Sequence, residues 1–424
     1  MSAEHPRRKT QVLRHAIALI VSSGASSVLG LLFWGVASRR YSTEALGEAS
    51  AAISAMGLLA LIAQFNLKNV YTRFLPRAGY ATFRFVLFGY MVSVLSGLVL
   101  AGGFLALGLA RHFLQPGLGP EVLFVTGVAL WVVFVLQDAV LASIRATVWL
   151  PVENTAYALL KLSLVAAVVF AGSTGILLAW VLSCGGAVGV VSVYLFWRAI
   201  PRHGRETSSG SQLPSRRALA GFVAGEYVAS LATSTLTFLV PVLVVRMIGA
   251  KAGGYFIVPW LVGWGIQTLL WNVATAFVVD HGFDPELRQA SLARSVRFSL
   301  VVLGVASVAL IAGAGPLLDI LSGVRYAAHG ALLLRLCVLA SVVGALPVLY
   351  QTLVWVEGRV WNVAMVQTGL ALAALTTMLA LVGATGVNAP GYGLLAGQCA
   401  VAAVLVVPTH RKWRSFGQTP APVV

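Results

Sequence analysis

Apolar runs of about twenty residues recur along almost the whole chain, and they constrain its fold more than any other feature. They begin at Ala16 and continue nearly to the C-terminus of the 424-residue sequence. A helix of roughly 20 apolar residues is long enough to cross the hydrocarbon core of a bilayer. Because backbone groups in lipid must be hydrogen-bonded within their own segment, these runs predict membrane-spanning helices. Short alternating segments, as in a transmembrane barrel, are not the pattern here.

The composition excludes an ordinary soluble protein. Hydrophobic residues make up 59% of the chain and charged residues only 10%, against about 25% charged in soluble domains. The net charge of +16 comes from Lys and Arg in the breaks between apolar runs, so nucleic-acid binding is not expected. Cys184, Cys337 and Cys399 lie inside apolar runs, without the spacing of a disulfide framework or a metal site. No metal or cofactor is expected.

The apolar runs predict an all-α polytopic membrane protein with about twelve transmembrane helices. Basic residues precede the first run, which is too long for a signal-peptide core and is predicted to be a retained span. The predicted spans are 16–38, 47–67, 85–110, 121–143, 155–172, 175–197, 219–246, 254–279, 297–320, 331–354, 361–383 and 391–408.

The distribution of basic residues predicts the orientation of these spans. With the N-terminus inside, 21 of the 29 Lys and Arg residues fall in cytoplasmic segments and six fall outside. An excess of Lys and Arg in cytoplasmic loops is the usual topology signal. We therefore expect a multi-pass protein of the cell inner (plasma) membrane with both termini in the cytoplasm.

One long polar stretch, RAIPRHGRETSSGSQLPSRRA at 198–218, divides the chain. Its Pro, Gly and Ser content is typical of a flexible linker. The predicted organisation is an N-terminal six-helix bundle at 1–197, a cytoplasmic linker at 198–218, and a C-terminal six-helix bundle with a short cytoplasmic tail at 219–424. Two halves with the same orientation are expected to be related by a pseudo-two-fold axis along the membrane normal.

Short matches between the halves indicate an internal repeat. RYSTEALG at 40–47 and RMIGAKAG at 246–253 both place six residues between Arg and Gly. A duplication is the simplest source of such matches. Further matches pair Asn66 with Asn272, Arg84-Phe85 with Arg297-Phe298, and Val148-Trp149 with Val360-Trp361.

Two stretches carry a resemblance to a known family. They are LGLLFWGVASRRYSTEALGEASAAISAMGLLALIAQFNLKNVYTRFLPRAG at 29–79 and MIGAKAGGYFIVPWL at 247–261. The chain resembles, over nearly its whole length, the polysaccharide transporters of the multidrug/oligosaccharidyl-lipid/polysaccharide (MOP) flippase superfamily, which include the O-antigen flippases.

The resemblance implies two six-helix bundles in a V-shaped, MATE-like arrangement around a central cavity. It implies translocation of a lipid-linked saccharide by alternating access, with membrane lipid and a polysaccharide polymerase or glycosyltransferases as further partners. In relatives that flip peptidoglycan precursors, a basic cluster in the cavity binds pyrophosphate. The first span here carries Ser22, Ser23, Ser26 and Ser27 instead of arginine, which leaves the anion-binding residues open.

Ionisable residues inside spans are the first candidates for substrate binding, because each costs about 2.5–3.5 kcal/mol at the membrane centre on insertion scales. Lys161 would either meet a phosphate in a cavity or snorkel to the cytoplasmic interface. Arg335 would either bind the phosphate or saccharide or anchor its helix at the outer interface. Glu226 would balance a cavity cation or carry a proton, and otherwise face interfacial water. Asp138, next to Gln137, would take part in transport or pair with Arg145.

Uncharged polar and aromatic residues are the second group of candidates. Gln64 and Asn66 at the inner end of the second span, with Arg73 beyond, offer donors for a head group or hydrogen bonds between helices. Asn272 has the corresponding place in the eighth span. Trp264, in a helical stripe with Trp260 and Trp271, would stack on sugar rings or face lipid.

The chain has none of the motifs of nucleotide hydrolysis, zinc peptidases or serine hydrolases, so no catalytic residue and no enzyme activity is expected. The predicted function is a flippase that moves a polyprenyl-pyrophosphate-linked saccharide from the cytoplasmic to the outer leaflet for cell-surface polysaccharide synthesis. One alternative is an ion-coupled multidrug exporter of the same superfamily. Another is a membrane-embedded glycosyltransferase, for which Glu44 and Glu48 are the only candidate acids in an outer loop.

Overall fold

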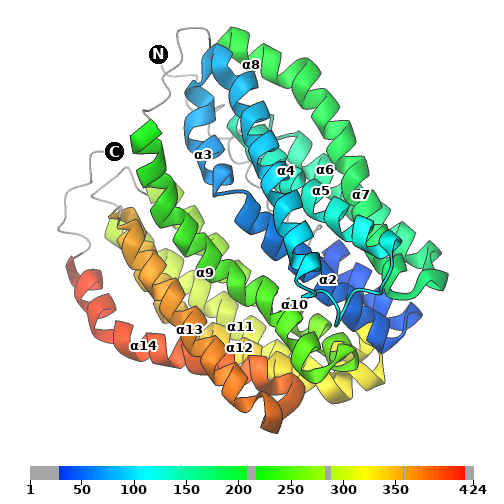
Figure 1. Cartoon of the computed structure of the whole chain (residues 1–424). Helices are drawn as coiled ribbons and strands as arrows, with labels where there is room; N and C mark the ends of the chain where they lie inside the picture. The colour runs from blue at the N-terminus through cyan, green and yellow to red at the C-terminus, as the bar shows by residue number, and fades with distance from the viewer. Residues whose placement is uncertain (1–27, 145, 208–215, 282–287, 358, 416–424) are drawn as a thin grey trace. The chain divides into compact units, whose positions relative to one another are not determined.

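The computed structural model describes residues 28–144, 146–207, 216–281, 288–357 and 359–415, and these residues are helical with short connections and no strand. The predicted spans after the first each coincide with a long helix (Figure 1). Of the first predicted span, 28–38 is described and is helical. The long helices are α2 (Thr43–Ala63), α4 (Thr82–Ala106), α5 (Leu118–Ser143), α6 (Trp149–Ala167), α7 (Gly172–Tyr194), α9 (Arg216–Ile248), α10 (Ala250–His281), α11 (Arg288–Ser322), α12 (Val324–Val356), α13 (Val360–Thr385) and α14 (Ala389–Ser415).

Length and surface both identify a multi-pass membrane protein. Within the described ranges, eight helical segments are long and apolar enough to cross a bilayer. The outer surface of α4 exposes a stripe of large apolar side chains at helical spacing, and such a stripe is stable in lipid but not in water. The stripe consists of Leu87, Phe88, Met91, Leu95 and Val99.

Helix α6 is shifted towards the N-terminus at both ends relative to its predicted span. It begins at Trp149, six residues before the predicted start at 155, and ends at Ala167. Glu153 and Asn154 lower the local hydropathy, so the apolar run that predicts the span begins only after them, although the helix already includes both residues. The helix ends early because the chain turns at Gly172, whose φ of 55° suits glycine.

Part of the predicted linker is also helical. After a π-helical turn at Leu195–Ala199, α8 spans Ile200–Glu206. Pro201 at the start of α8 suits a first helical turn, and Arg202 pairs with Glu206 one turn later, at 2.7 Å between Nε and Oε1. Residues 208–215 of the predicted linker lie outside the described part of the chain.

The chain divides into two compact units. The first comprises Met1–Tyr41, Leu59–Arg111 and Gln115–Leu219, and the second comprises Ser42–Leu58, His112–Leu114 and Ala220–Val424. In the first unit α5 packs against α4 and α7, and α6 packs mainly against α7. The predicted organisation into two bundles of six helices stays a prediction.

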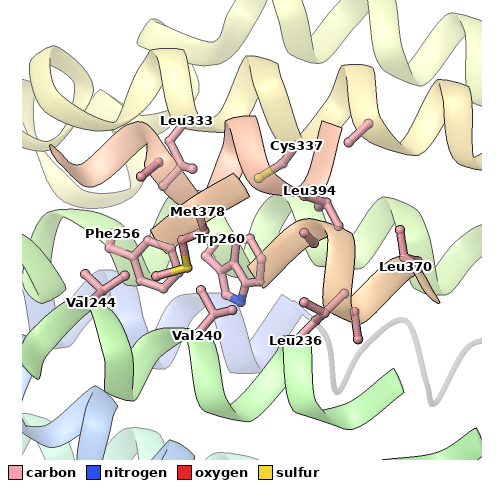
Figure 2. Packing of buried hydrophobic residues seen from close by; sticks show 14 residues of the cluster. Leu236, Val240, Val244, Phe256, Trp260, Leu333, Cys337, Leu370, Met378 and Leu394 are labelled. Atoms are coloured by element: carbon pink, nitrogen blue, oxygen red, sulfur yellow. The ribbon is translucent and has the colours of Figure 1, made fainter. Parts of the chain in front are cut away.

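The second unit is built around an apolar core between α9, α10, α12, α13 and α14. The Trp260 ring lies among side chains from these helices, next to Phe256 (Figure 2). Only 2% of Trp260 is exposed. In the same unit α13 packs along α14, and Lys412 near the end of α14 contacts both carboxylate oxygens of Glu357, at 2.6 and 2.5 Å.

The two copies of the repeated Arg-to-Gly motif meet inside the second unit. A Cβ added at Gly47 of α2 would lie 1.8 Å from the carbonyl oxygen of Ala250, at the start of α10. A Cβ added at Gly254 would lie 2.1 Å from the carbonyl oxygen of Thr43. The two backbones therefore cross so closely that only glycine fits at Gly47 and Gly254. We call this crossing of 43–47 with 250–254 the glycine junction.

A left-handed break separates α2 from α3 (Leu67–Phe74). Phe65 and Asn66 have φ values of 48° and 60°, a region that side-chain-bearing residues rarely enter. The amide of Leu67 donates to the carbonyl of Gln64 at 2.8 Å and thereby closes the turn. The helix of the predicted second span thus ends at Ala63, just before this break and four residues before its predicted end.

Candidate functional site

Lys161 is enclosed within the first unit. It lies on α6 and is 9% exposed, with its ammonium 4.7 Å from the ring centroids of both Phe33 and Tyr157. A cation at this distance from an aromatic face is attracted by the ring quadrupole. No carboxylate in the described residues forms an ion pair with Lys161. The side chain neither snorkels to an interface nor reaches an open surface.

Glu153 is the ionisable residue that the sequence did not single out. It is 3% exposed, and one of its carboxylate oxygens accepts a hydrogen bond from the side-chain amide of Gln137. Its position two turns before Lys161, with Tyr157 between them, places all three on one face of α6. This spacing of four residues was the available signal, but the predicted span began beyond Glu153.

Asp138 lies beside Glu153 at the end of α5. The Asn154 side chain hydrogen-bonds the Asp138 carboxylate, and Lys68 and Glu153 interact with it electrostatically. Ser192 of α7 donates to the Gln137 carbonyl at 3.4 Å. The predicted pairing of Asp138 with Arg145 lies outside the described residues. Helices α5, α6 and α7 thus enclose two neighbouring carboxyl groups.

The polar residues at the end of α2 form no open donor surface together. Gln64 and Asn66 are buried, and the Asn69 side-chain amide donates to the Asn66 side-chain oxygen at 3.0 Å. Arg73 is exposed on α3, with its guanidinium 5.7 Å from the Phe74 ring centroid. A hydrogen bond within the protein therefore occupies the Asn66 side-chain oxygen, whereas its side-chain amide nitrogen is buried without a partner in the described residues and Arg73 remains accessible.

Arg335 lies on an exposed stripe of α12 with Leu332, Leu339 and Val342. Its Nε donates to the carbonyl oxygen of Ile311 in α11 at 3.1 Å. This bond fixes the guanidinium, and the structure records no other partner for it among the described residues. Since Arg335 comes eleven residues after Val324, the first of the 33 residues of α12, it lies about 16 Å along this helix, within its first half.

The remaining predicted residues contribute little to a defined site. Glu226 is half-buried on α9, and the side chain of Asn272 lies outside the described residues. Trp264 stacks on Trp260, with 5.7 Å between ring centroids. Trp260 belongs to the apolar core and Trp264 is half-buried beside it, so stacking of Trp264 on a sugar ring stays a prediction.

The predicted residues thus fall into two groups. Lys161 and Asp138 lie in the first unit, where Glu153 joins them. Arg335, Glu226 and Trp264 lie in the second unit.

No family model matches the chain, and no curated protein sequence matches it. Solved structures do match. One is a multidrug resistance MATE family transporter of the MOP superfamily in its inward-facing conformation, with a TM-score of 0.71, 13% identity, and coverage of 93% of this chain and 96% of that one. The outward-facing conformation of such a transporter matches with a TM-score of 0.60, 14% identity and 96% coverage of both chains.

The lipid II flippase MurJ, in an inward closed conformation, is also similar. It has a TM-score of 0.68 and 10% identity, and the match covers 96% of this chain and 90% of MurJ. These similarities extend over nearly the whole chain. The protein therefore has the all-helical fold of the MATE transporters and MurJ, as the sequence predicted.

Proposed function

We propose that the protein is a flippase that moves a polyprenyl-pyrophosphate-linked saccharide from the cytoplasmic to the outer leaflet of the inner membrane. Its fold is shared with MurJ, which is a lipid II flippase. The proposal includes cytoplasmic termini and alternating access between two like-oriented bundles. A substrate of this kind presents a multiply charged phosphate group that must pass through the membrane.

Arg335 is the observation that carries this proposal. Its guanidinium is exposed on α12, within the first half of a helix long enough to cross the membrane, and its Nε already donates to the carbonyl oxygen of Ile311. The two terminal amino groups of a guanidinium form charge-assisted hydrogen bonds with phosphate oxygens. An arginine held in this way is suited to bind an anion without losing much side-chain freedom.

A second candidate function is an ion-coupled multidrug exporter. The buried carboxyl pair Asp138 and Glu153 favours it, since exporters of cationic compounds exchange charge at such groups. The glycosyltransferase alternative has no comparable support, because Glu44 lies in the first turn of α2. The flippase remains our first proposal because Arg335 suits an anionic substrate.

Depletion of the protein tests the two candidates against each other. Lipid-linked saccharides are extracted and assigned to a membrane side by their accessibility to a membrane-impermeant enzyme. We expect the intermediate to accumulate on the cytoplasmic face. Increased drug sensitivity without such accumulation would favour the exporter.

Complementation with Arg335→Gln tests the proposed phosphate contact. We expect transport to fall at least tenfold while membrane abundance stays normal. Arg325→Gln is the matched control, because Arg325 is an exposed arginine of the same helix and should leave transport unchanged. Full transport by Arg335→Gln would remove Arg335 from the substrate path.

A further inference from the structure

A groove in the second unit lies between the first turns of α11 and the end of α14. It has a volume of about 440 Å³ and is lined by Val296, Arg297, Leu300 and Val301 of α11 and by Trp413 of α14. Leu300 and Val301 are 51% and 59% exposed, and adjoining large apolar side chains at a surface indicate contact with lipid or a ligand. The groove therefore combines a cationic side chain with an apolar wall.

The charge around the groove is positive. Arg297 is exposed, and no ion pair in the described residues includes it. The end of α14 that carries Trp413 also carries Arg411 and Arg414, which are exposed and equally outside these ion pairs. Glu357 contacts this end of α14 but is already paired with Lys412 at 2.5 Å. An excess of unpaired guanidinium groups favours an anionic ligand.

The wall formed by Trp413 is held in place. Lys412, the preceding residue, contacts both carboxylate oxygens of Glu357, at 2.6 and 2.5 Å. Because Glu357 caps the end of α12, this contact attaches the end of α14 to α12. A tryptophan ring is amphipathic and is typical of the depth at which head groups meet acyl chains. In the predicted orientation the groove lies at the cytoplasmic interface of the membrane.

An exposed apolar face of α11 continues from the groove along the helix. Val305 and Val308 follow Val301 at helical spacing and are 68% and 71% exposed. Between them, a Cβ added at Gly304 would meet nothing within 4 Å. From Val301 to Val308 this face is about 10 Å long, so an acyl chain can lie along it.

We propose that the groove binds one anionic phospholipid, with its phosphate at Arg297, its glycerol backbone against Trp413 and an acyl chain along Val301 and Val305. Guanidinium groups form charge-assisted hydrogen bonds with phosphate oxygens, and basic pockets between membrane helices bind anionic head groups. A soluble anion lacks the apolar chain, and a zwitterionic phospholipid lacks the net charge. The lipid is a bound partner and not the transported substrate, so this proposal does not rest on the proposed function.

Native mass spectrometry of the purified, delipidated full-length protein measures how many lipids each chain binds. Phosphatidylglycerol is the anionic probe, and phosphatidylcholine with the same acyl chains is the neutral probe. We expect one phosphatidylglycerol per chain to bind more tightly than phosphatidylcholine. Arg297→Gln should weaken phosphatidylglycerol binding about fivefold, the effect of losing one cation near an anionic lipid. Leu300→Trp fills the groove without changing its charge and should weaken binding of both lipids.

Two control variants make the same chemical changes away from the groove, and both should bind lipid like the wild type. Arg205→Gln removes an exposed arginine of α8 on the same predicted side of the membrane. Leu372→Trp adds the same ring at an exposed position of α13.

Three results would overturn the proposal. The first is equal binding of the two lipids, or unchanged phosphatidylglycerol binding in both groove variants. The second is phosphatidylglycerol binding that occurs only after removal of residues 416–424, since the groove would then belong to the C-terminal segment. The third is displacement of phosphatidylglycerol by an equimolar polyprenyl phosphate, which would assign the groove to the transported lipid and leave the proposed function intact.

Discussion

At the scale of single residues, Lys161 shows how burial changes the meaning of a charge. Its ammonium is enclosed by Phe33 and Tyr157 and has no carboxylate partner among the described residues. Attraction to the two rings is worth about 2 kcal/mol or more each when desolvated, and removing an ammonium from water costs several kcal/mol. Because these opposing free energies are of similar size, the ammonium of Lys161 adds little net stability to the fold.

We predict that Lys161→Met unfolds at the same temperature as the wild type or higher, because methionine fills similar space without a buried charge. Phe33→Ala should unfold at a lower temperature, since truncating a fully buried phenylalanine costs about 3–5 kcal/mol. Thermal unfolding of the purified protein in detergent measures both. Equal destabilisation by the two changes would mean that the ammonium itself stabilises the fold.

At the scale of helices, the glycine junction depends on the absence of two side chains. We predict that Gly47→Ala lowers the unfolding temperature by several degrees, because the added Cβ meets the backbone of Ala250 and overpacking costs about 1–3 kcal/mol. Gly265→Ala on α10 is the control, since nothing lies within 4 Å of its added Cβ. Alanine there should be neutral or stabilising by up to about 1 kcal/mol. Similar losses from both substitutions would contradict the junction.

The helices themselves were largely predictable, because an apolar run of bilayer length leaves the backbone little choice but a helix. The residues at which the helices begin and end were less predictable. Helix α6 includes Glu153 because neighbouring helices bury that carboxyl group. A hydropathy average depends only on neighbours in the sequence, so it contains no information on burial by other helices. For the same reason the sequence pointed to Asp138 but not to its partner, and it did not show that Trp260 lies in a core.

At the scale of the whole molecule, the glycine junction joins a segment from each half of the sequence. If transport proceeds by alternating access, segments from the two halves must separate at some stage. The side chains of Thr43 and Tyr326 face each other beside this junction. A covalent link between residues 43 and 326 would therefore keep the two segments of the glycine junction together.

We predict that a short cleavable thiol cross-linker between Thr43→Cys and Tyr326→Cys blocks transport, and that cleavage restores it. The background carries Cys399→Ser, since Cys399 is exposed while Cys184 and Cys337 are buried. Glu357→Cys with Lys412→Cys is the control pair, because these side chains touch within the C-terminal half. Transport that continues with the first pair linked would show that the junction stays closed throughout the cycle.

The left-handed break between α2 and α3 has a mechanical consequence. A side-chain-bearing residue pays roughly 1–2 kcal/mol in this conformation, and Phe65 and Asn66 adopt it in succession. The backbone therefore stores conformational strain at this joint. If the joint became helical, residues 64–66 and the eight residues of α3 would continue α2 as one helix, about 16 Å longer than α2 is now.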